Sequence, residues 1–123
     1  MGLLRMEKWR EDAISWIHHH VSEMPETPQT KWHVTKPSLV AQTGALHVIR
    51  YLPLNFVPLS DFSVTLERGI ALEWRNGEKE LTVTIMEDGS VEALKCVSDD
   101  VVEEKVYPTA DWRLGAWFDW VAS

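Results

Sequence analysis

Two amphipathic segments open the chain and predict two helices. From residue 6 to residue 24, core-type positions recur at steps of three and four, as on one face of a helix, and Pro25 follows. Ser38 suits the N-cap of a second helix, which Pro53 would end, although Gly44 within it weakens the pattern. The positions expected to face the core are Met6, Trp9, Ala13, Trp16, Ile17, His20, Val21 and Met24 in the first segment, then Leu39, Ala45, Leu46, Ile49 and Leu52.

After Ser60 the pattern changes to an alternation of apolar and polar residues. Phe62, Val64 and Leu66 alternate with polar neighbours, as in a half-buried strand. The next two strands, residues 69 to 75 and 78 to 86, flank Asn76-Gly77, a dipeptide typical of type I′ hairpin turns. A two-residue loop there places Leu72 opposite Leu81, Trp74 opposite Lys79 and Glu73 opposite Glu80.

A second turn, at Asp88-Gly89, leads into a strand over residues 90 to 97 whose register has two alternatives. A two-residue loop turns Cys96 toward the core and Lys95 outward. A three-residue loop with a glycine bulge does the reverse. We favour the two-residue loop, because burying an ammonium group without a partner is costly.

The end of the chain predicts one more strand and one more helix. Residues 98 to 105 are acidic, with a short edge strand from Val101 to Tyr107, and Thr109 can cap a helix that carries Trp112, Trp117 and Trp120 on its apolar side. The fold class is therefore α+β. It has two N-terminal helices, an antiparallel meander of three to four strands and one C-terminal helix, in a single domain over residues 1 to 123.

Part of this pattern resembles a group of short uncharacterised bacterial proteins. The shared features are Pro37-Ser38 at a helix start, the run Gly69-Ile70-Ala71-Leu72-Glu73-Trp74, Asn76-Gly77, the alternation from Glu80 to Ile85, and Asp88-Gly89-Ser90. The resemblance covers about two-thirds of the chain and implies the same element order in one domain, without implying an activity. In the preceding loop the group tends to have Trp-Asp-Gly, where this chain has Trp32-His33-Val34.

Composition and charge narrow the classes of function. The chain has 123 residues, 45% apolar and 25% charged, with a net charge of −7, as expected of one globular domain. Residues 61 to 123 hold fourteen Asp and Glu against six Lys and Arg, whereas residues 1 to 60 are nearly balanced. An acidic half disfavours direct binding to nucleic-acid phosphates and favours a basic protein partner.

The same composition predicts a cytoplasmic protein that does not enter membranes. Charged residues interrupt the first twenty positions, where a secretory signal needs an apolar run, and no apolar stretch approaches the length of a membrane span. The single cysteine, Cys96, excludes an internal disulfide and fits a reducing compartment.

Motifs for catalysis or metal binding are missing from the sequence. His18, His19 and His20 follow one another, and successive helical residues point about 100° apart, so they do not converge on one ion. Asp99 and Asp100 would raise the pKa of the Cys96 thiol and make it a poor nucleophile. We therefore predict no catalytic residue, no metal and no cofactor.

The opposed carboxylates Glu73 and Glu80 are the most specific candidate site. Like charges directly across a sheet invite a cation, which a metal, a shared proton or a partner's arginine could supply, or Arg75 or Lys95 of this chain. The leading hypothesis is a non-enzymatic interaction domain, of the kind found in antitoxins, phage-borne inhibitors and accessory subunits, whose acidic surface binds a basic protein. Its predicted partner-binding residues are Glu73, Glu80, Glu87, Asp88, Asp99, Asp100, Glu103, Glu104 and, as an exposed aromatic anchor, Phe118.

The alternative is a small hydrolase-type enzyme, in which His33 or His47 would act with Glu73 and Glu80 across a cleft beside the Trp32 loop. A homodimer, formed through the last helix or an edge strand, is compatible with either hypothesis.

Overall fold

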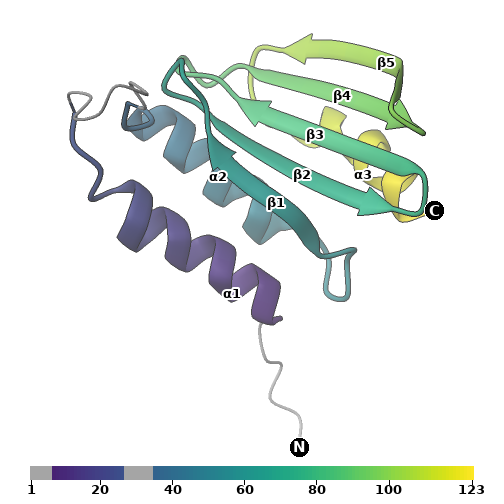
Figure 1. Ribbon diagram of the computed structural model, residues 1–123, viewed down its shortest axis with the longest axis horizontal. Helices are drawn as coiled ribbons and strands as arrows, with labels where there is room; N and C mark the ends of the chain where they lie inside the picture. Colours follow the sequence, from purple (N-terminus) through teal and green to yellow (C-terminus); the bar gives the residue numbers. More distant parts are fainter. Residues whose placement is uncertain (1–6, 27–34) are drawn as a thin grey trace, which may run out of the picture.

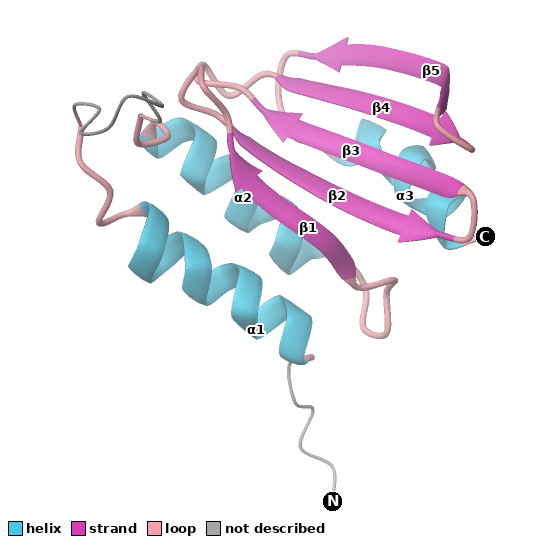
Figure 2. Cartoon of the chain, viewed as in Figure 1, coloured by secondary structure: helices cyan, strands magenta, loops and turns pink. Residues whose placement is uncertain are grey.

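The five strands of the described residues pair in chain order and run antiparallel throughout, with β1 and β5 at the edges of one sheet (Figure 1). The computed structural model describes residues 7–26 and 35–123. The described helices lie on one face of the sheet and leave the other uncovered (Figure 2). In chain order the elements are α1 Lys8–Ser15, the π-helix η1 Trp16–Val21, α2 Leu39–Tyr51, β1 Leu59–Val64, β2 Ile70–Asn76, β3 Lys79–Ile85, β4 Val91–Val97, β5 Asp100–Tyr107, the 3₁₀-helix η2 Trp112–Leu114 and α3 Gly115–Ala122.

The α+β class and the antiparallel arrangement agree with the sequence prediction, but the sheet has five strands rather than three or four. β1 begins at Leu59 and ends at Val64, so Leu66 lies beyond it and is 71% exposed. The predicted edge strand near Val101 is present as β5. Buried apolar side chains from the strands and the helices form one cluster between the two layers.

The first helix differs from the uninterrupted α-helix that its spacing predicts. Ala13, Ile17 and Val21 are buried, but η1 replaces the α-helix from Trp16 onward. Positions four apart drift around an α-helix, and a π turn, closed by hydrogen bonds five residues apart, is wide enough to return them to one side. His20, expected beside the buried stripe, is exposed.

A buried arginine joins the first helix to the second. The Arg10 side chain is 5% exposed, and its guanidinium donates to the carbonyl oxygens of Ile49 at 3.0 Å, Leu52 at 2.6 Å and Pro53 at 2.8 Å. These carbonyls lie where α2 ends and has no further helical N–H to bind them. Arg10 Nε also donates to Glu7 Oε2 at 2.8 Å. Arg10 therefore serves as the C-terminal cap of α2.

The helix α2 begins and ends where the sequence predicts. The Ser38 hydroxyl accepts a hydrogen bond from the Ala41 N–H at 3.0 Å, and the helix stops before Pro53. Gly44 has a packing role, because a Cβ there would lie 2.8 Å from Cγ2 of Ile85 on β3. Leu39, predicted to face the core, is instead 75% exposed.

The hairpin between β2 and β3 has a register different from the predicted one. Its loop is Gly77-Glu78 rather than Asn76-Gly77, and Gly77 alone in the loop has a positive φ, 64°, as in a type II′ turn. This register pairs Trp74 with Leu81 instead of Lys79. The apolar residues still share one face, so the shift exchanges a mismatched pair for a matched one.

The hairpin between β3 and β4 has the three-residue loop, so the preferred register was wrong. Ile85 pairs with Val91, and Gly89 lies in the loop with φ 91°. Lys95 therefore points to the helical side and Cys96 to the uncovered side. The ammonium is not isolated there: Lys95 Nζ lies 2.8 Å from Glu103 Oε1 and 4.7 Å from the centre of the Trp117 ring. These contacts offset the desolvation cost on which the prediction relied.

The C-terminal helical segment begins at Asp111 rather than Thr109. The Asp111 carboxylate accepts from the Arg113 N–H at 3.0 Å and caps η2, and α3 follows. Trp117 is buried as expected, whereas Trp112 is 85% exposed. Among the described residues, no helix is long and apolar enough to span a membrane.

Candidate functional site

The side of the sheet away from the helices carries an unbalanced set of charges. We call it the open face. Strand alternation places five carboxylates on the open face and one cation, Arg75. The carboxylates are Asp61 of β1, Glu73 of β2, Glu80 of β3, Glu92 of β4 and Glu104 of β5. They are distributed over all five strands, so the negative charge covers the whole face.

The predicted Glu73–Glu80 opposition does not occur, because the register differs. Glu73 lies opposite Thr82 on one side and Asp61 on the other, and Glu80 lies opposite Arg75. Arg75 joins the two glutamates: its Nε is 3.1 Å from Glu73 Oε1 and its terminal nitrogen is 3.2 Å from Glu80 Oε1. Arg75 is therefore the cation that binds this pair, and it was one of the two candidates within the chain. The other candidate, Lys95, lies on the helical side of the sheet.

The two glutamates still interact with each other. A hydrogen bond between their carboxyl groups raises the pKa of Glu73, helped by burial, and the same hydrogen bond lowers the pKa of Glu80. A proton that enters this site as the pH falls therefore resides on Glu73. At neutral pH, two carboxylates share one guanidinium, and the cluster with Asp61 keeps a net negative charge.

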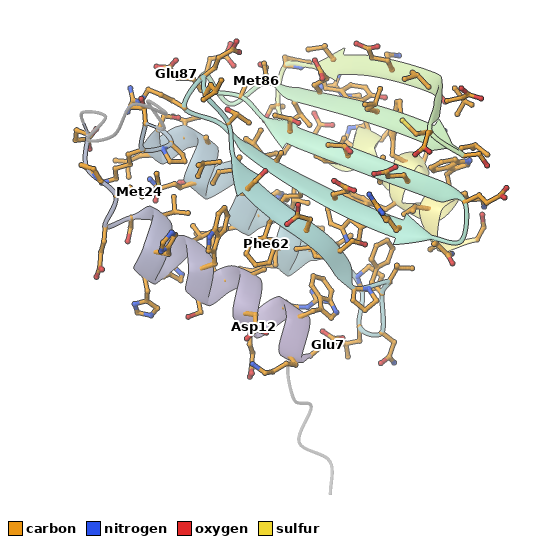
Figure 3. The ribbon with its side chains drawn as sticks, viewed as in Figure 1. Glu7, Asp12, Met24, Phe62, Met86 and Glu87 are labelled. Atoms are coloured by element: carbon orange, nitrogen blue, oxygen red, sulfur yellow. The ribbon has the colours of Figure 1, made fainter. Side chains whose placement is uncertain are left out.

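The predicted partner-binding residues from Glu87 to Asp100 are divided by the length of β4. Glu87 and Asp88 lie in the β3–β4 loop, and Asp99 and Asp100 at the other end of the strand, about 23 Å away for seven residues. Figure 3 labels Glu87 at its corner of the sheet. Glu103 points to the helical side and binds Lys95. Of the predicted partner-binding residues, only Glu73, Glu80 and Glu104 project from strands onto the open face.

The loop carboxylates already have partners within the chain. Glu87 lies 3.3 Å from Arg68. Asp88 accepts hydrogen bonds from the Ser90 hydroxyl at 2.6 Å and the Ser90 N–H at 2.9 Å, which lower its pKa. Both side chains therefore order the loop.

An apolar strip crosses the acidic face on β4 and β5. Leu94, Cys96, Val101 and Val106 have outward positions in these strands, and the two valines are 58% and 60% exposed. Burial raises the pKa of the Cys96 thiol, and the carboxylates of Glu80 and Asp99 raise it further, as the sequence predicted for the neighbouring aspartates. The thiol is protonated at neutral pH and is a poor nucleophile.

Phe118 is not the exposed anchor that the sequence predicts. Its ring packs edge-on against Trp74 at 5.2 Å and Phe56 at 5.9 Å between ring centres. The exposed aromatic of this region is Trp112, at the start of η2. The prediction that Trp112 and Trp117 share one apolar side is wrong, because η2 is a 3₁₀ turn and rotates Trp112 away from the face that Trp117 occupies.

Two adjoining hollows, of about 500 and 470 Å³, lie between α2 and the segment from Pro108 to α3. His47 and Ala110 line both, and the exposed rings of Tyr51 and Trp112 line the second. The sequence analysis did not predict this surface, because it assigned Leu39 to the core. Leu39 and Tyr51 are instead exposed beside the buried face of α2. No buried polar side chain lines it: among the described residues those are Arg10 and Gln42, which lie elsewhere. The hollows thus offer apolar surface without a convergent set of polar groups.

The residues of the enzymatic alternative do not come together. His47 lies on α2, which packs on the helical side of the sheet, whereas Glu73 and Glu80 project from the opposite side. His33 and the Trp32 loop lie outside the described residues. Within residues 7–26 and 35–123, no group of three or more His, Cys, Asp or Glu is placed to hold a metal ion.

The chain matches no protein-family model, no curated protein and no solved structure. Function is therefore inferred from the placement of the side chains alone.

Proposed function

We propose that the chain is a protein-interaction domain of the cytoplasm, and that its open face binds a basic protein surface. The observation that carries the proposal is the ratio of five carboxylates to one guanidinium on a sheet face that no described helix covers. A basic partner is the occupant whose charge complements this face.

The apolar strip favours a protein over a nucleic acid as that partner. Leu94 and Val106 alternate with Glu92 and Glu104 on β4 and β5, so this part of the face mixes apolar and charged side chains. Protein interfaces combine the same two kinds of side chain, with apolar contacts supplying affinity and charged groups supplying orientation. A phosphate backbone would instead meet five like charges.

The experiment is an NMR titration of the full chain with poly-L-lysine as a defined cationic probe. We expect the amide signals of Thr82, Leu94 and Cys96 to shift most, since they lie on the open face. The double variant Glu80→Gln, Glu92→Gln should weaken binding by about 3- to 10-fold, and added salt should weaken it further.

The matched control changes two exposed carboxylates of the helical layer, Glu11→Gln and Glu23→Gln. It removes the same charge from the other side of the molecule and should bind the probe nearly as wild type. Equal weakening by both double variants would contradict the proposal, because binding would then follow net charge alone. Shifts centred on the helices, or equally strong binding to duplex DNA, would also contradict it.

A further inference from the structure

The edge strand β5 offers an unusually accessible pairing surface. β5 lies at the end of the strand order, and no element of the described residues pairs with its outer side (Figure 1). Every residue from Asp100 to Val106 is exposed, including three valines at 55 to 60%. An edge strand presents a row of free backbone N–H and C=O groups, and this strand has no proline, although four of its eight residues are charged.

The side chains of β5 are complementary to those of a second β5 running antiparallel. With Glu104 on the symmetry axis, Glu103 of one copy lies opposite Lys105 of the other, and Val102, the bulged residue of β5, lies beside Val106. Two-fold symmetry produces each pair twice. Opposite-charge and β-branched cross-strand contacts are both favourable, so two of each outweigh the single like-charge pair of Glu104 with itself.

The two neighbouring registers are not complementary. Centred on Glu103, the pairing would place Val101 opposite Lys105 and Val102 opposite Glu104. Centred on Lys105, it would place Glu104 opposite Val106 and Glu103 opposite Tyr107, so neither register has an ion pair or an apolar pair. The groups that the first register requires remain accessible: Lys105 is exposed, although its Nζ lies 5.4 Å from the centre of the Tyr107 ring. Lys95 binds Oε1 of Glu103, which leaves Oε2 for a lysine of the second copy.

We propose that β5 pairs antiparallel with β5 of a second copy, centred on Glu104, and joins two five-stranded sheets into one continuous sheet. The symmetry axis is perpendicular to the sheet, so both open faces lie on the same side and both helical layers on the other. The dimer extends the acidic face without covering it. A single strand pair buries a small area, so we expect a dissociation constant on the order of 10 to 100 µM.

Disulfide trapping tests the register. In a Cys96→Ser background, Glu104→Cys places a cysteine opposite itself, with Cα atoms about 4.5 to 5.5 Å apart, within disulfide range. We expect rapid formation of a covalent dimer under mild oxidation. The matched control, Asp61→Cys in the same background, puts an exposed cysteine on the other edge strand and should cross-link only at the slow rate of random collisions.

Sedimentation of the full chain tests the energetics. Val106→Lys should weaken the dimer at least 10-fold, whereas Leu66→Lys, an exposed apolar residue away from β5, should not change it. Glu104→Gln removes the like-charge pair and should tighten the dimer about 2- to 5-fold.

Three results would overturn the proposal. The first is a wild-type chain that sediments as a monomer well above about 100 µM. The second is equal cross-linking of Glu104→Cys and Asp61→Cys. The third is association that persists in Val106→Lys. None of these depends on the poly-L-lysine titration, so the dimer and the open-face proposal can fail separately.

Discussion

The two edge strands of the sheet are built in different ways. β1 is short, follows Pro58 and packs beside α1, where Figure 3 shows Phe62 between the strand and the helix, its ring 4.6 Å from that of Trp16. β5 is longer, and all its residues except Tyr107 are exposed. Both have an irregular register at one end, so a bulge does not distinguish them. The difference is that α1 covers the β1 edge, whereas no described helix covers the β5 edge.

This difference follows from where the helices pack. Arg10 fixes α1 to the end of α2, and α1 then shields β1 from other strands. On the opposite side, α3 contacts β2 and β3, and β5 is held to the helical layer chiefly through Tyr107. Edge strands without cover tend to pair with other chains. The β1 side therefore serves stability, whereas the β5 side remains available for association.

The largest expected effect comes from breaking the anchor of the β1 side. Arg10→Met should lower the free energy of unfolding by about 3 to 5 kcal/mol, because the carbonyls at the end of α2 lose a charged donor inside the protein. Urea unfolding measures the loss, and Arg10→Lys should retain part of the stability. Hydrogen exchange should accelerate first in α1 and β1.

The control for this variant is Arg50→Met on the exposed side of α2, which should change stability by less than about 0.5 kcal/mol. A similar cost for both substitutions would mean that Arg10 acts through general charge rather than as a cap. Faster exchange in β5 than in β1 would contradict the separation of the two edges.

A smaller effect should follow from loosening the β5 side. The Trp117 indole N–H donates to the Tyr107 hydroxyl at 2.8 Å in a buried contact. Tyr107→Phe leaves that N–H without its acceptor and should cost about 1 to 2 kcal/mol in thermal or urea unfolding. Tyr51→Phe, whose ring is 79% exposed, is the matched control and should be neutral. If Tyr107→Phe is also neutral, Tyr107 does not anchor β5.

Local patterns predicted the elements better than their pairing. Ser38 and Pro53 act within a few residues, so the bounds of α2 could be read from the sequence. The registers of both hairpins were missed, because each depends on which residues meet across the sheet. Lys95 can lie on the helical side because Glu103 and Trp117 contact its ammonium group there. Neither contact can be predicted from the sequence of β4 alone.

The candidate site shows the same division. The predicted hairpin register placed Glu73 and Glu80 on one sheet face, and they do share it, because the observed register differs by two residues and keeps each side chain on its face. Their neutralisation by Arg75, the opposition of Asp61 and Glu73, and the separation of Glu87 from Asp99 by the length of β4 all required the register. Arg10 as the cap of α2 could not be predicted, because about forty residues separate donor and acceptors.

The smallest expected effect probes the charge of the open face next to β5. Cys96 lies opposite Glu80, whose carboxylate helps to raise the pKa of the thiol, although burial is the larger cause. Glu80→Gln should therefore lower that pKa and increase the rate of alkylation by iodoacetamide about two-fold near pH 8, in proportion to the thiolate fraction. The rate is followed by mass spectrometry from about pH 7 to about pH 10, and Glu11→Gln on α1 should leave it unchanged. Because the substitution acts on ionisation, the wild-type and Glu80→Gln rates should approach each other as the thiol becomes fully ionised. A constant ratio at every pH would instead mean that Glu80 shields the sulfur sterically, and the negative potential assigned to the open face would lose its support at this position.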